Sequence, residues 1–547
     1  MVWTPSRGRQ CWSLPVWTPG SYTVRDHAQH LHRLELSQFS VPINVRRYNP
    51  SRWTADVEPD TPVKLYYRIE ARQLTVRTCY LDPDLASLCL SSIVMLIEGH
   101  RWEIHHLSLL LPDQWTVTVP LPLSRDRGDY VALDFDQLVD SPVHAGRLAL
   151  HSFAVNGYHH LLVLHGEPPQ GWPTSLLDDV TAICQATCLL MEGPPPSGDN
   201  YQIVLLLLDN GYGGLEHDNS SVLHFSWSTL ASARGYRQLL QLIGHEYLHQ
   251  WNVRRLRPQE LIPYDYERAV ISDGLWFAEG ITSYFDLFLP FLAGCSNQLT
   301  ALQDLSAEIS WLLKTPGRKV QSLADSSREA WIKLYKAVPS SADVQVSYYR
   351  LGTALAFCLD VRLRCAGSSL AELLRTLYQS HGRYQRGFCR KDVEQQLSSL
   401  GGQNLTGQLA NWLDCPDTLP LQESIAMVGL RLNPVFASHR CSGFQLKLHN
   451  DTITVTRVIA GGAAQTAGVI VGDELLAIDG YRIRRPDSLP KLIPDQGICE
   501  LSLCRRGRML TLCLDPGPPE VERWEIDYEP EAALKNIALR EQWFQII

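Results

Sequence analysis

The chain has 547 residues, with 49 Lys and Arg against 58 Asp and Glu, and therefore carries a formal net charge of −9. At about 100–200 residues per domain, this length predicts three or four domains. Apolar residues make up 45% and charged residues 20%, which excludes extended disorder, and the acidic balance provides no basic surface for nucleic acid or an anionic membrane. We expect a multidomain globular protein that binds neither nucleic acid nor a membrane.

Roughly the first 150 residues consist of short apolar runs broken by Pro, Gly and Asp, a pattern typical of an antiparallel β domain. We place this domain at residues 1–155. The expected strands are Val63–Ala71, Leu74–Tyr80, Trp115–Val119 and Leu148–Val155. Residues Met1–Trp12 are rich in Arg and show no such pattern, which indicates that either the first strands are absent or the start is placed too late.

From Pro173 the apolar period becomes helical, and it defines a second domain at residues 156–415. One buried strand, Gln202–Leu208, interrupts the helical pattern. The expected helices are Pro173–Met191, Trp227–Trp251, Leu275–Leu289, Leu299–Thr315, Tyr348–Ala366, Ser369–Leu377 and Arg390–Leu400. This order of elements predicts a multidomain α+β fold in which the second domain has a helical part.

The C-terminal part returns to short strands after a connector at Cys415–Leu421. Short apolar runs and Gly/Asp turns over Leu446–Leu514 predict a small domain, which we place at residues 425–516. A proline cluster at Pro516–Pro519 leads into an acidic segment. We expect a helical tail over residues 517–547.

Cysteine usage and the absence of targeting signals favour a cytoplasmic location. The 14 cysteines are irregularly spaced, and the closest pairs, Cys184/Cys188 and Cys499/Cys504, do not form a C-x-x-C motif. Residues Met1–Val16 lack the apolar core of a signal peptide. The longest apolar runs are far shorter than the roughly 20 residues that a membrane-spanning helix needs.

The most informative motif is His245-Glu246-Tyr247-Leu248-His249, an H-E-x-x-H on a predicted helix. Histidines four positions apart lie on one helix face, so both rings can point at one ion, and Glu246 can reach a water molecule beside it. A catalytic zinc site needs one further protein ligand and an open position. In the longer motif H-E-x-x-H-x-x-G-x-x-H the third ligand is the last His, but Asn252 and Arg255 stand here in place of its Gly and last His. The third ligand is therefore expected to be a downstream carboxylate.

Several acidic residues follow the motif: Glu260, Asp265, Glu267, Asp273 and Glu279. Glu260 and Glu267 lie in a loop-like stretch rich in Pro and Tyr, which gives no fixed geometry. Glu279 lies in a buried-looking helical segment, Leu275–Gly280, where an unpaired carboxylate would be costly. We therefore expect Glu279 to be the third ligand.

Several motifs carry a family resemblance. They are HEYLHQWNVRRLRP (His245–Pro258), LWFAEGITSYF (Leu275–Phe285), GGLEH (Gly213–His217), WTPGSY (Trp17–Tyr22) and the C-terminal segment that is similar to a PDZ domain. In this order and over nearly the whole chain, they resemble the glycyl aminopeptidase family of zinc peptidases. The resemblance implies an N-terminal antiparallel β domain, a thermolysin-like catalytic domain with a helical part, and a PDZ-like domain.

The resemblance also implies roles for individual residues. His245, His249 and Glu279 would bind one Zn²⁺ per chain, and Glu246 would act as the general base. Tyr349, three residues before Gly352, would stabilise the developing oxyanion. Tyr348 is the competing donor, and Leu351 stands where such families often have Lys, which weakens the assignment of the tyrosine.

The Gly213–His217 segment is expected to bind the substrate. Adjacent glycines, Gly213 and Gly214, let a backbone approach closely, and an extended segment here can pair with a peptide as an added strand. An exopeptidase must also stabilise a free α-ammonium group, and Glu216 is the natural carboxylate for it. For His217 two roles are equally expected: it contacts the substrate, or it is structural.

The PDZ-like segment is identified by Gly461–Gly468 and Gly472–Gly480, with Asp473 as a turn residue. Ser442–Leu446 stands where a PDZ domain holds its carboxylate-binding loop, so the groove is a candidate site for a peptide C-terminus. Gln445 replaces the usual glycine, and Pro490 falls in the helix that flanks the groove. Packing against the catalytic cleft is the alternative role.

Together, these features predict a cytoplasmic zinc aminopeptidase that removes small N-terminal residues, Gly or Ala, from peptides with a free N-terminus. One alternative is a zinc endopeptidase whose PDZ-like domain selects C-termini. The other is a scaffold derived from an inactive peptidase, which the presence of the complete site residues disfavours.

Overall fold

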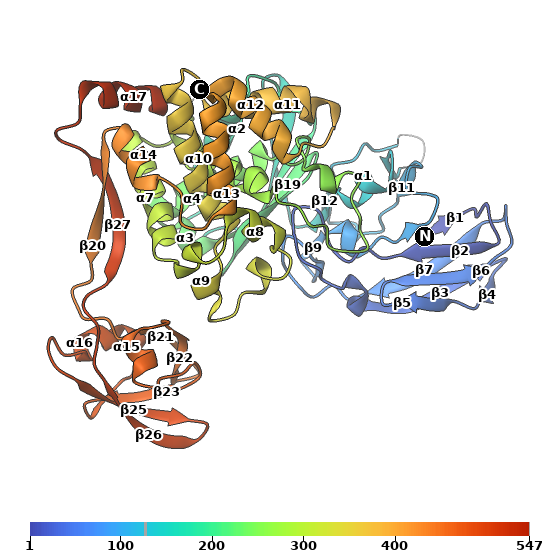
Figure 1. Cartoon of the computed structure of the whole chain (residues 1–547). Coiled ribbons are helices and arrows are strands. Elements are labelled where there is room, and N and C mark those ends of the chain that lie inside the picture. Colours follow the sequence, from blue (N-terminus) through green and yellow to red (C-terminus); the bar gives the residue numbers. More distant parts are fainter. Residues whose placement is uncertain (125–127, 546–547) are drawn as a thin grey trace. The chain divides into compact units, whose positions relative to one another are not determined.

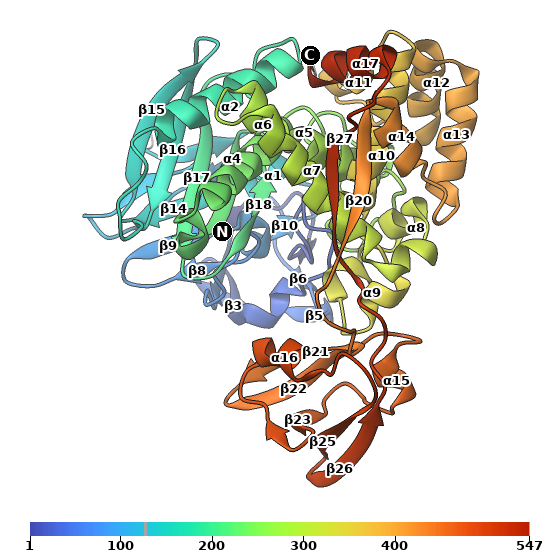
Figure 2. The same ribbon diagram turned by 90° about the vertical axis from the view of Figure 1, so that its left-hand side faces the viewer.

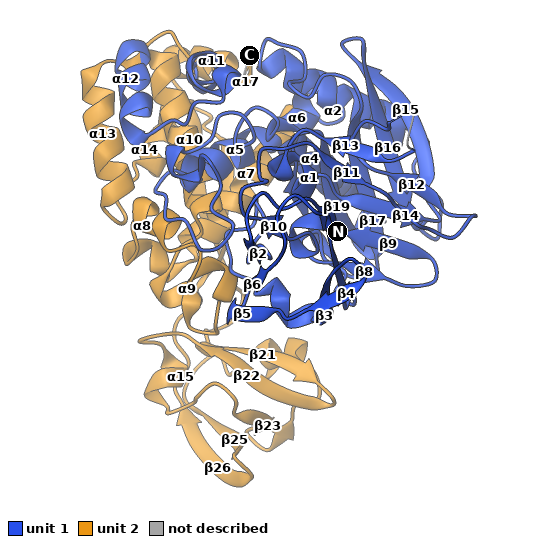
Figure 3. Cartoon of the chain, turned by 90° about the vertical axis from the view of Figure 1, so that its right-hand side faces the viewer, with its two compact units in different colours: residues 1–297, 369–400, 546–547 blue, residues 298–368, 401–545 orange. Residues whose placement is uncertain are grey.

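The fold is given by a computed structural model, which describes residues 1–124 and 128–545. Within these ranges the chain forms two compact units (Figure 3). Unit 1 comprises residues 1–297 and 369–400, and unit 2 comprises residues 298–368 and 401–545. Residues 125–127 of the expected β domain and 546–547 of the expected tail lie outside the described residues.

Unit 1 begins with two four-stranded antiparallel sheets around a core that contains Trp12, Trp53 and Leu65 (Figure 1). One sheet has the order β1 (Val2–Trp3), β7 (Val63–Ile69), β3 (Leu31–Gln38) and β4 (Val41–Ile43), and the other has β10 (Leu96–Ile97), β2 (Arg9–Ser13), β6 (Arg52–Asp56) and β5 (Arg46–Asn49). Strands β1 and β2 lie in the segment that was expected to be unpatterned. That expectation is wrong, because Trp12 in β2 is a fully buried core residue.

The expected strand Leu74–Tyr80 is also wrong, because most of this segment is a turn. The hydroxyls of Thr75 and Thr78 are 2.7 Å apart, and the Thr78 hydroxyl donates to the carbonyl of Gln73 at 2.6 Å. Such local side-chain hydrogen bonds compete with strand pairing. Beyond the turn lie two further sheets, formed by β12 (Thr116–Thr118), β14 (Val143–Gly146), β9 (Leu85–Leu88) and β8 (Tyr80–Leu81), and by β11 (His105–Leu107) with β13 (Tyr130–Ala132).

A five-stranded sheet forms the framework of the peptidase region. Its order is β15 (Ala149–Val155), β16 (Tyr158–His165), β17 (Tyr201–Leu208), β19 (Ser220–Ser226) and β18 (Tyr212–Glu216). Strand β17 runs parallel to β16 and β19, whereas β18 pairs antiparallel with β19 and ends the sheet. Strands β15 and β16 form a hairpin, so the expected domain boundary after residue 155 falls inside a paired unit.

Helices α2 (Leu176–Leu190) and α4 (Ala233–Leu248) pack against each other and on this sheet (Figure 2). The expected helix Trp227–Trp251 is divided into α3 (Trp227–Leu230) and α4, because the Ser232 hydroxyl caps α4 by accepting the Gly235 N–H at 2.9 Å. The next expected helix, Leu275–Leu289, comprises the π-helical turn η4 (Trp276–Gly280), α5 (Ile281–Asp286) and α6 (Leu289–Leu292). Unit 1 also contains α1 (Phe135–Val139), α11 (Leu370–Ser380) and α12 (Arg390–Gly401).

Unit 2 combines a helical part with the C-terminal small domain. Its helical part consists of α7 (Gln298–Leu313), α8 (Leu323–Arg328), α9 (Ser341–Val344), α10 (Tyr348–Cys365), α13 (Gln403–Asp414) and α14 (Leu421–Met427). Helices α7 and α10 agree with the expected ranges to within two residues at each end. Helix α13 was not expected, and the expected connector at Cys415–Leu421 leads directly into α14.

A two-stranded arm joins the small domain to the helical part. The chain enters through β20 (Leu430–Phe436) and returns through β27 (Val521–Tyr528), which pair antiparallel. Ser306 of α7 donates to the Trp524 carbonyl at 3.0 Å and accepts the Ile526 N–H at 3.0 Å, and so it fixes β27 on the helical part. The expected helical tail is therefore corrected to a strand followed by α17 (Leu534–Phe544).

The small domain is built on a six-stranded sheet, β21 (Phe444–His449), β22 (Thr452–Val458), β23 (Glu474–Ile478), β25 (Cys499–Arg505) and β26 (Arg508–Leu514), with β24 (Tyr481–Arg482) on β23. The buried Asp473 side chain accepts the Ile470 N–H and pairs with Arg505, which gives it the expected turn role. Pro490 lies in the first turn of the short helix α16 (Leu489–Leu492). Among the residues that the structure describes, no helix is long and apolar enough to cross a bilayer.

Candidate metal centre and substrate strand

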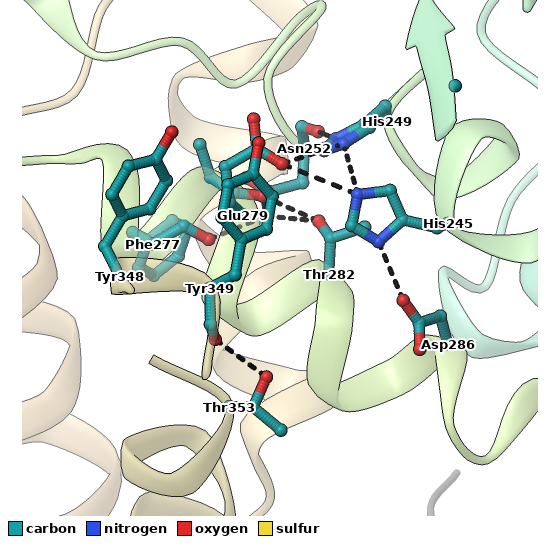
Figure 4. Close-up of polar contacts among 12 residues, drawn as sticks. His245, His249, Asn252, Phe277, Glu279, Thr282, Asp286, Tyr348, Tyr349 and Thr353 are labelled. Carbon is teal, nitrogen blue, oxygen red and sulfur yellow. Dashed lines mark hydrogen bonds and ion pairs between the residues drawn. The ribbon is translucent and has the colours of Figure 1, made fainter. Parts of the chain in front are cut away.

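Three side chains of unit 1 bring their donor atoms to one point (Figure 4). His245 lies in the last turn of α4, His249 follows as its C-cap residue, and Glu279 projects from η4. The two Nε2 atoms are 3.0 Å apart, and Glu279 Oε2 lies 3.5 Å from His245 Nε2 and 3.2 Å from His249 Nε2. These are the three residues that the sequence predicted to converge, and as a group they can hold a metal ion.

Each histidine is oriented by a hydrogen bond from its other ring nitrogen. His245 Nδ1 donates to Asp286 Oδ2 at 2.7 Å, and His249 Nδ1 donates to the carbonyl of Asn252 at 2.7 Å. These bonds leave both Nε2 atoms as lone-pair donors that face one another. Two facing lone pairs need a cation between them, so the tautomers fit a metal site.

The third donor is positioned by the π-helical turn. A π turn leaves backbone carbonyls without their usual helical donors. The side chain of Asn252 donates to the carbonyls of Phe277 and Ala278, at 3.0 and 3.1 Å, and so ties η4 to the segment that follows α4. Asn252 is fully buried, and it contacts both the His249 ring and the turn that carries Glu279.

Charge is balanced around the three donors. Burial alone would raise the pKa of Glu279, but His249 and His245 outweigh it and lower this pKa to about 2. Burial opposes a positive charge on His245, but the Asp286 carboxylate, which accepts a hydrogen bond from the ring, and the nearby Glu279 carboxylate raise its pKa. The site thus holds Glu279 as a carboxylate in a buried position.

Glu246 lies beside the donors with its carboxylate against β18, the strand that was predicted to bind the substrate. A Cβ atom added to Gly214 would fall 2.0 Å from Glu246 Oε1, so only glycine leaves room for this approach. Glu246 is 5% exposed, and its Oε2 has no hydrogen-bond partner among the described residues. Burial raises the pKa of Glu246 to about 7.

Glu216, at the end of β18, is a second buried carboxylate without a partner. It is 4% exposed, its Oε1 is buried, and the described residues offer it neither a hydrogen bond nor an ion pair. Ligand atoms of Glu216, Glu246 and His249 all lie within 4.8 Å of one another. A buried carboxylate oxygen without a hydrogen-bond donor is costly, and a cationic ligand that donates to it would offset that cost.

The turn Thr18–Ser21 in the N-terminal domain lies against Glu216. A Cβ atom on Gly20 would lie 2.6 Å from Glu216 Oε2, so the glycine backbone packs directly on the carboxylate. The turn is fixed by Trp17, whose indole N–H donates to the Asp265 carbonyl at 2.7 Å. The sequence singled out this motif but gave no signal that it touches Glu216.

His217 points away from Glu216 into a buried ion-pair network. Its Nδ1 lies 3.0 Å from Asp140 Oδ1, and Asp140 also pairs with Arg254 at 2.8 Å. Arg254 in turn pairs with Asp218 at 2.8 Å, and the network therefore ties β18 to the segment after α4. His217 Nε2 is buried without a hydrogen-bond partner in the described chain. A contact between His217 and substrate stays a prediction.

Tyr348 and Tyr349 open helix α10 in unit 2. Their rings stack with centroids 4.7 Å apart, and the Tyr335 hydroxyl lies 3.2 Å from that of Tyr348 and 3.1 Å from that of Tyr349. Tyr348 is fully buried, whereas Tyr349 is partly exposed. Partial exposure favours Tyr349 over Tyr348 for contact with a substrate. The sequence did not predict the role of Tyr335.

The other acidic candidates are engaged elsewhere. Glu260 accepts a hydrogen bond from Ser272 at 3.0 Å, and Glu267 pairs with Arg52 at 3.3 Å, and both are exposed. The sequence missed Asp286 and Asn252. Asp286 was detectable, because it lies seven positions after Glu279, two helical turns along the same face.

Comparisons with known proteins give matches along most of the chain. Residues 238–355 match the M61 glycyl aminopeptidase model, residues 2–147 the peptidase M61 N-terminal domain, and residues 435–487 the PDZ domain. A solved aminopeptidase N family protein from Idiomarina loihiensis is 27% identical, has a TM-score of 0.92, and is matched over 99% of this chain and 96% of that one. A search of curated proteins found no match.

A more distant likeness is to the M1 zinc metallopeptidase of Deinococcus radiodurans, 13% identical over 76% of this chain and 88% of that one, with a TM-score of 0.47. A likeness of that size supports no conclusion about this chain. The β domain, the peptidase region and the PDZ domain instead follow the first structure along nearly its whole length, and they define a peptide hydrolase. The similarity to the M61 glycyl aminopeptidase family lies in the N-terminal domain and in the region that carries the three donors.

Proposed function

We propose that the protein is a zinc-dependent aminopeptidase that removes a small N-terminal residue from peptides. The observation that carries this proposal is the position of Glu216, whose ligand atom lies within 4.8 Å of those of Glu246 and of His249, one of the three donors. In any amino acid, the amine nitrogen lies only about 2.5 Å from its own carbonyl carbon. An ammonium group bound at Glu216 therefore places the first peptide bond, and no later one, beside the metal donors.

The three donors suit zinc. Zinc binds nitrogen and oxygen ligands at about 2.0–2.2 Å in a tetrahedral arrangement, which sets neighbouring ligand atoms roughly 3.3 Å apart. The separations of 3.0, 3.2 and 3.5 Å between donors of His245, His249 and Glu279 bracket that value. We propose that these residues bind one Zn²⁺ per chain, which would supply Lewis acidity for the attacking water and the scissile carbonyl.

The residues around the donors supply the remaining chemistry. Glu246 would take a proton from the attacking water and deliver it to the leaving amine, because its unpartnered Oε2 lies beside the donors. Glu216 would hold the substrate ammonium group, which compensates its buried charge. We retain Tyr349 as the proposed oxyanion donor. We propose a preference for small N-terminal residues: Gly, which the description of the matched family names, and Ala.

Two further proposals concern the rest of the molecule. Strand β21 ends the PDZ sheet and is paired only with β22 among the described strands, which supports capture of a peptide C-terminus along its free edge. The cytoplasmic location stays a prediction. The endopeptidase alternative is disfavoured because the buried Glu216 carboxylate suits a free ammonium group better than an uncharged peptide bond.

Metal analysis and substrate hydrolysis test the proposed function. The purified protein is expected to contain one zinc per chain, to hydrolyse glycyl and alanyl chromogenic amides, and to lose this activity to a chelator. Acetylation of the substrate amine should abolish hydrolysis. Equal rates on free and acetylated substrates would favour the endopeptidase, and a zinc-free, inactive protein would favour the scaffold.

A further inference from the structure

Arg77 lies in the turn that takes the place of the expected strand Leu74–Tyr80. The turn is held rigidly: the Arg77 N–H donates to the Thr75 hydroxyl at 3.2 Å, and Thr75 bonds to Thr78. Its neighbour Val76 is buried in the same apolar cluster as Leu215 of β18. The N-terminal domain thus delivers Arg77 to the substrate strand.

The guanidinium of Arg77 lies against β18, the outermost strand of the five-stranded sheet. It has no counter-ion among the described residues. Its Nη2 donates to the carbonyl of Gly214 at 3.1 Å, and its Nε is buried without a hydrogen-bond partner. No described carboxylate forms an ion pair with it. By contrast, the neighbouring buried Arg254 pairs with Asp140 and Asp218. A half-buried cation without an anion is costly, and a bound anion would offset that cost.

The spacing along β18 indicates which anion fits. Glu216 and Gly214 are two residues apart, which corresponds to roughly 7 Å in an extended strand. A peptide that binds antiparallel to β18 with its amine at Glu216 runs toward Gly214 and spans the same distance with its first two residues. A carboxylate on its second residue then meets Arg77.

We propose that Arg77 forms a carboxylate subsite, so that the enzyme prefers substrates whose second residue carries a carboxylate. The carboxylate is either the free C-terminus of a dipeptide or an acidic side chain at the second position. This inference rests on the proposed aminopeptidase function and adds a substrate class to it. The positive charge of Arg77 also acts on His224 of the neighbouring strand β19. Burial, aided by Arg77, lowers the pKa of His224 to about 4.

Hydrolysis of matched glycyl peptides by wild type, Arg77→Met and Arg77→Lys tests the subsite. The substrates are Gly-Leu with a free C-terminus, Gly-Leu amide and Gly-Glu amide. We expect wild type to favour at least one carboxylate-bearing substrate over Gly-Leu amide by at least about tenfold in kcat/KM. Arg77→Met should remove that preference, mainly through KM, and Arg77→Lys should restore part of it. Which substrate is favoured identifies the source of the carboxylate.

The matched control is Arg72→Met. Arg72 is an exposed arginine of the same segment, and it pairs with Glu70 at 2.8 Å. The kinetics of this variant should equal those of wild type. If Arg77→Met lowers kcat/KM equally for all three substrates, Arg77 only braces β18 and the carboxylate subsite is wrong. If wild type cleaves glycyl amides without any carboxylate preference, the subsite is wrong and the aminopeptidase stands. Absence of hydrolysis of all three contradicts the proposed function itself.

Discussion

The metal side and the substrate side of the site are completed in different ways. On the metal side, the ring nitrogens that face away from the centre are bound by Asp286 and Asn252. On the substrate side, Glu216 Oε1, Glu246 Oε2 and Arg77 Nε are buried without partners in the described chain. Buried polar groups are normally paired, so the unpaired atoms mark where a ligand belongs. The protein preorganises the metal side and leaves the substrate side to be completed by a peptide.

The two sides also differ in their construction. The metal donors come from α4 and from the π turn that shortly follows it in the chain. The substrate side joins Gly20, Arg77 and β18, which are far apart in the sequence, and the contact of Arg77 with Gly214 spans 137 positions. The proposed substrate site thus includes residues of the N-terminal domain. Variants of either side should separate zinc binding from substrate recognition.

Glu246→Gln should have the largest effect on rate. The substitution keeps the shape of the side chain and removes its ability to take a proton, so kcat should fall by roughly 10²–10⁴-fold. Zinc content, measured by metal analysis, should stay at the wild-type value. A near-normal rate in the zinc-loaded variant would refute Glu246 as the base.

Glu279→Gln should break the metal side. Replacing the only charged donor should weaken zinc affinity by more than about 100-fold, and activity should be lost with the metal. Chelator competition on the metal-free protein measures the affinity directly. Full zinc retention would move the third ligand to Glu260 or Glu267, although both are exposed and engaged with Ser272 and Arg52.

Asn252→Ser and Asp286→Asn should have a smaller effect on the metal side. Asp286→Asn replaces the carboxylate that orients His245, and Asn252→Ser removes the side-chain amide that ties η4, which carries Glu279, to the segment after α4. Such changes around metal ligands typically cost about 10–100-fold in metal affinity. Substrate KM in saturating zinc should change little, because neither residue lies on β18. Unchanged zinc affinity in both variants would show that neither the Asp286 carboxylate nor the Asn252 side chain positions the metal donors.

The sequence predicted those parts of the molecule that depend on local pattern. The alternation in Val63–Ile69 and the helical spacing of His245 and His249 each lie within one element, so they could be read directly. The turn at Leu74–Tyr80 was missed because hydroxyl hydrogen bonds, not apolar alternation, decide its shape. Gly20 and Asn252 were missed because their importance comes from contacts with segments distant in sequence.

The most direct test of the account compares wild type with Glu216→Ala and Glu216→Gln. Losing the carboxylate removes charge-assisted hydrogen bonds to the substrate ammonium group, which are worth roughly 2–5 kcal/mol when one partner is truncated. The account predicts that kcat/KM for a glycyl chromogenic amide falls at least about tenfold in both variants. Zinc content and any residual cleavage of N-acetylated peptides should stay unchanged. Unaltered kinetics in a wild type that requires a free amine would contradict Glu216 as the anchor and assign that role to another acid.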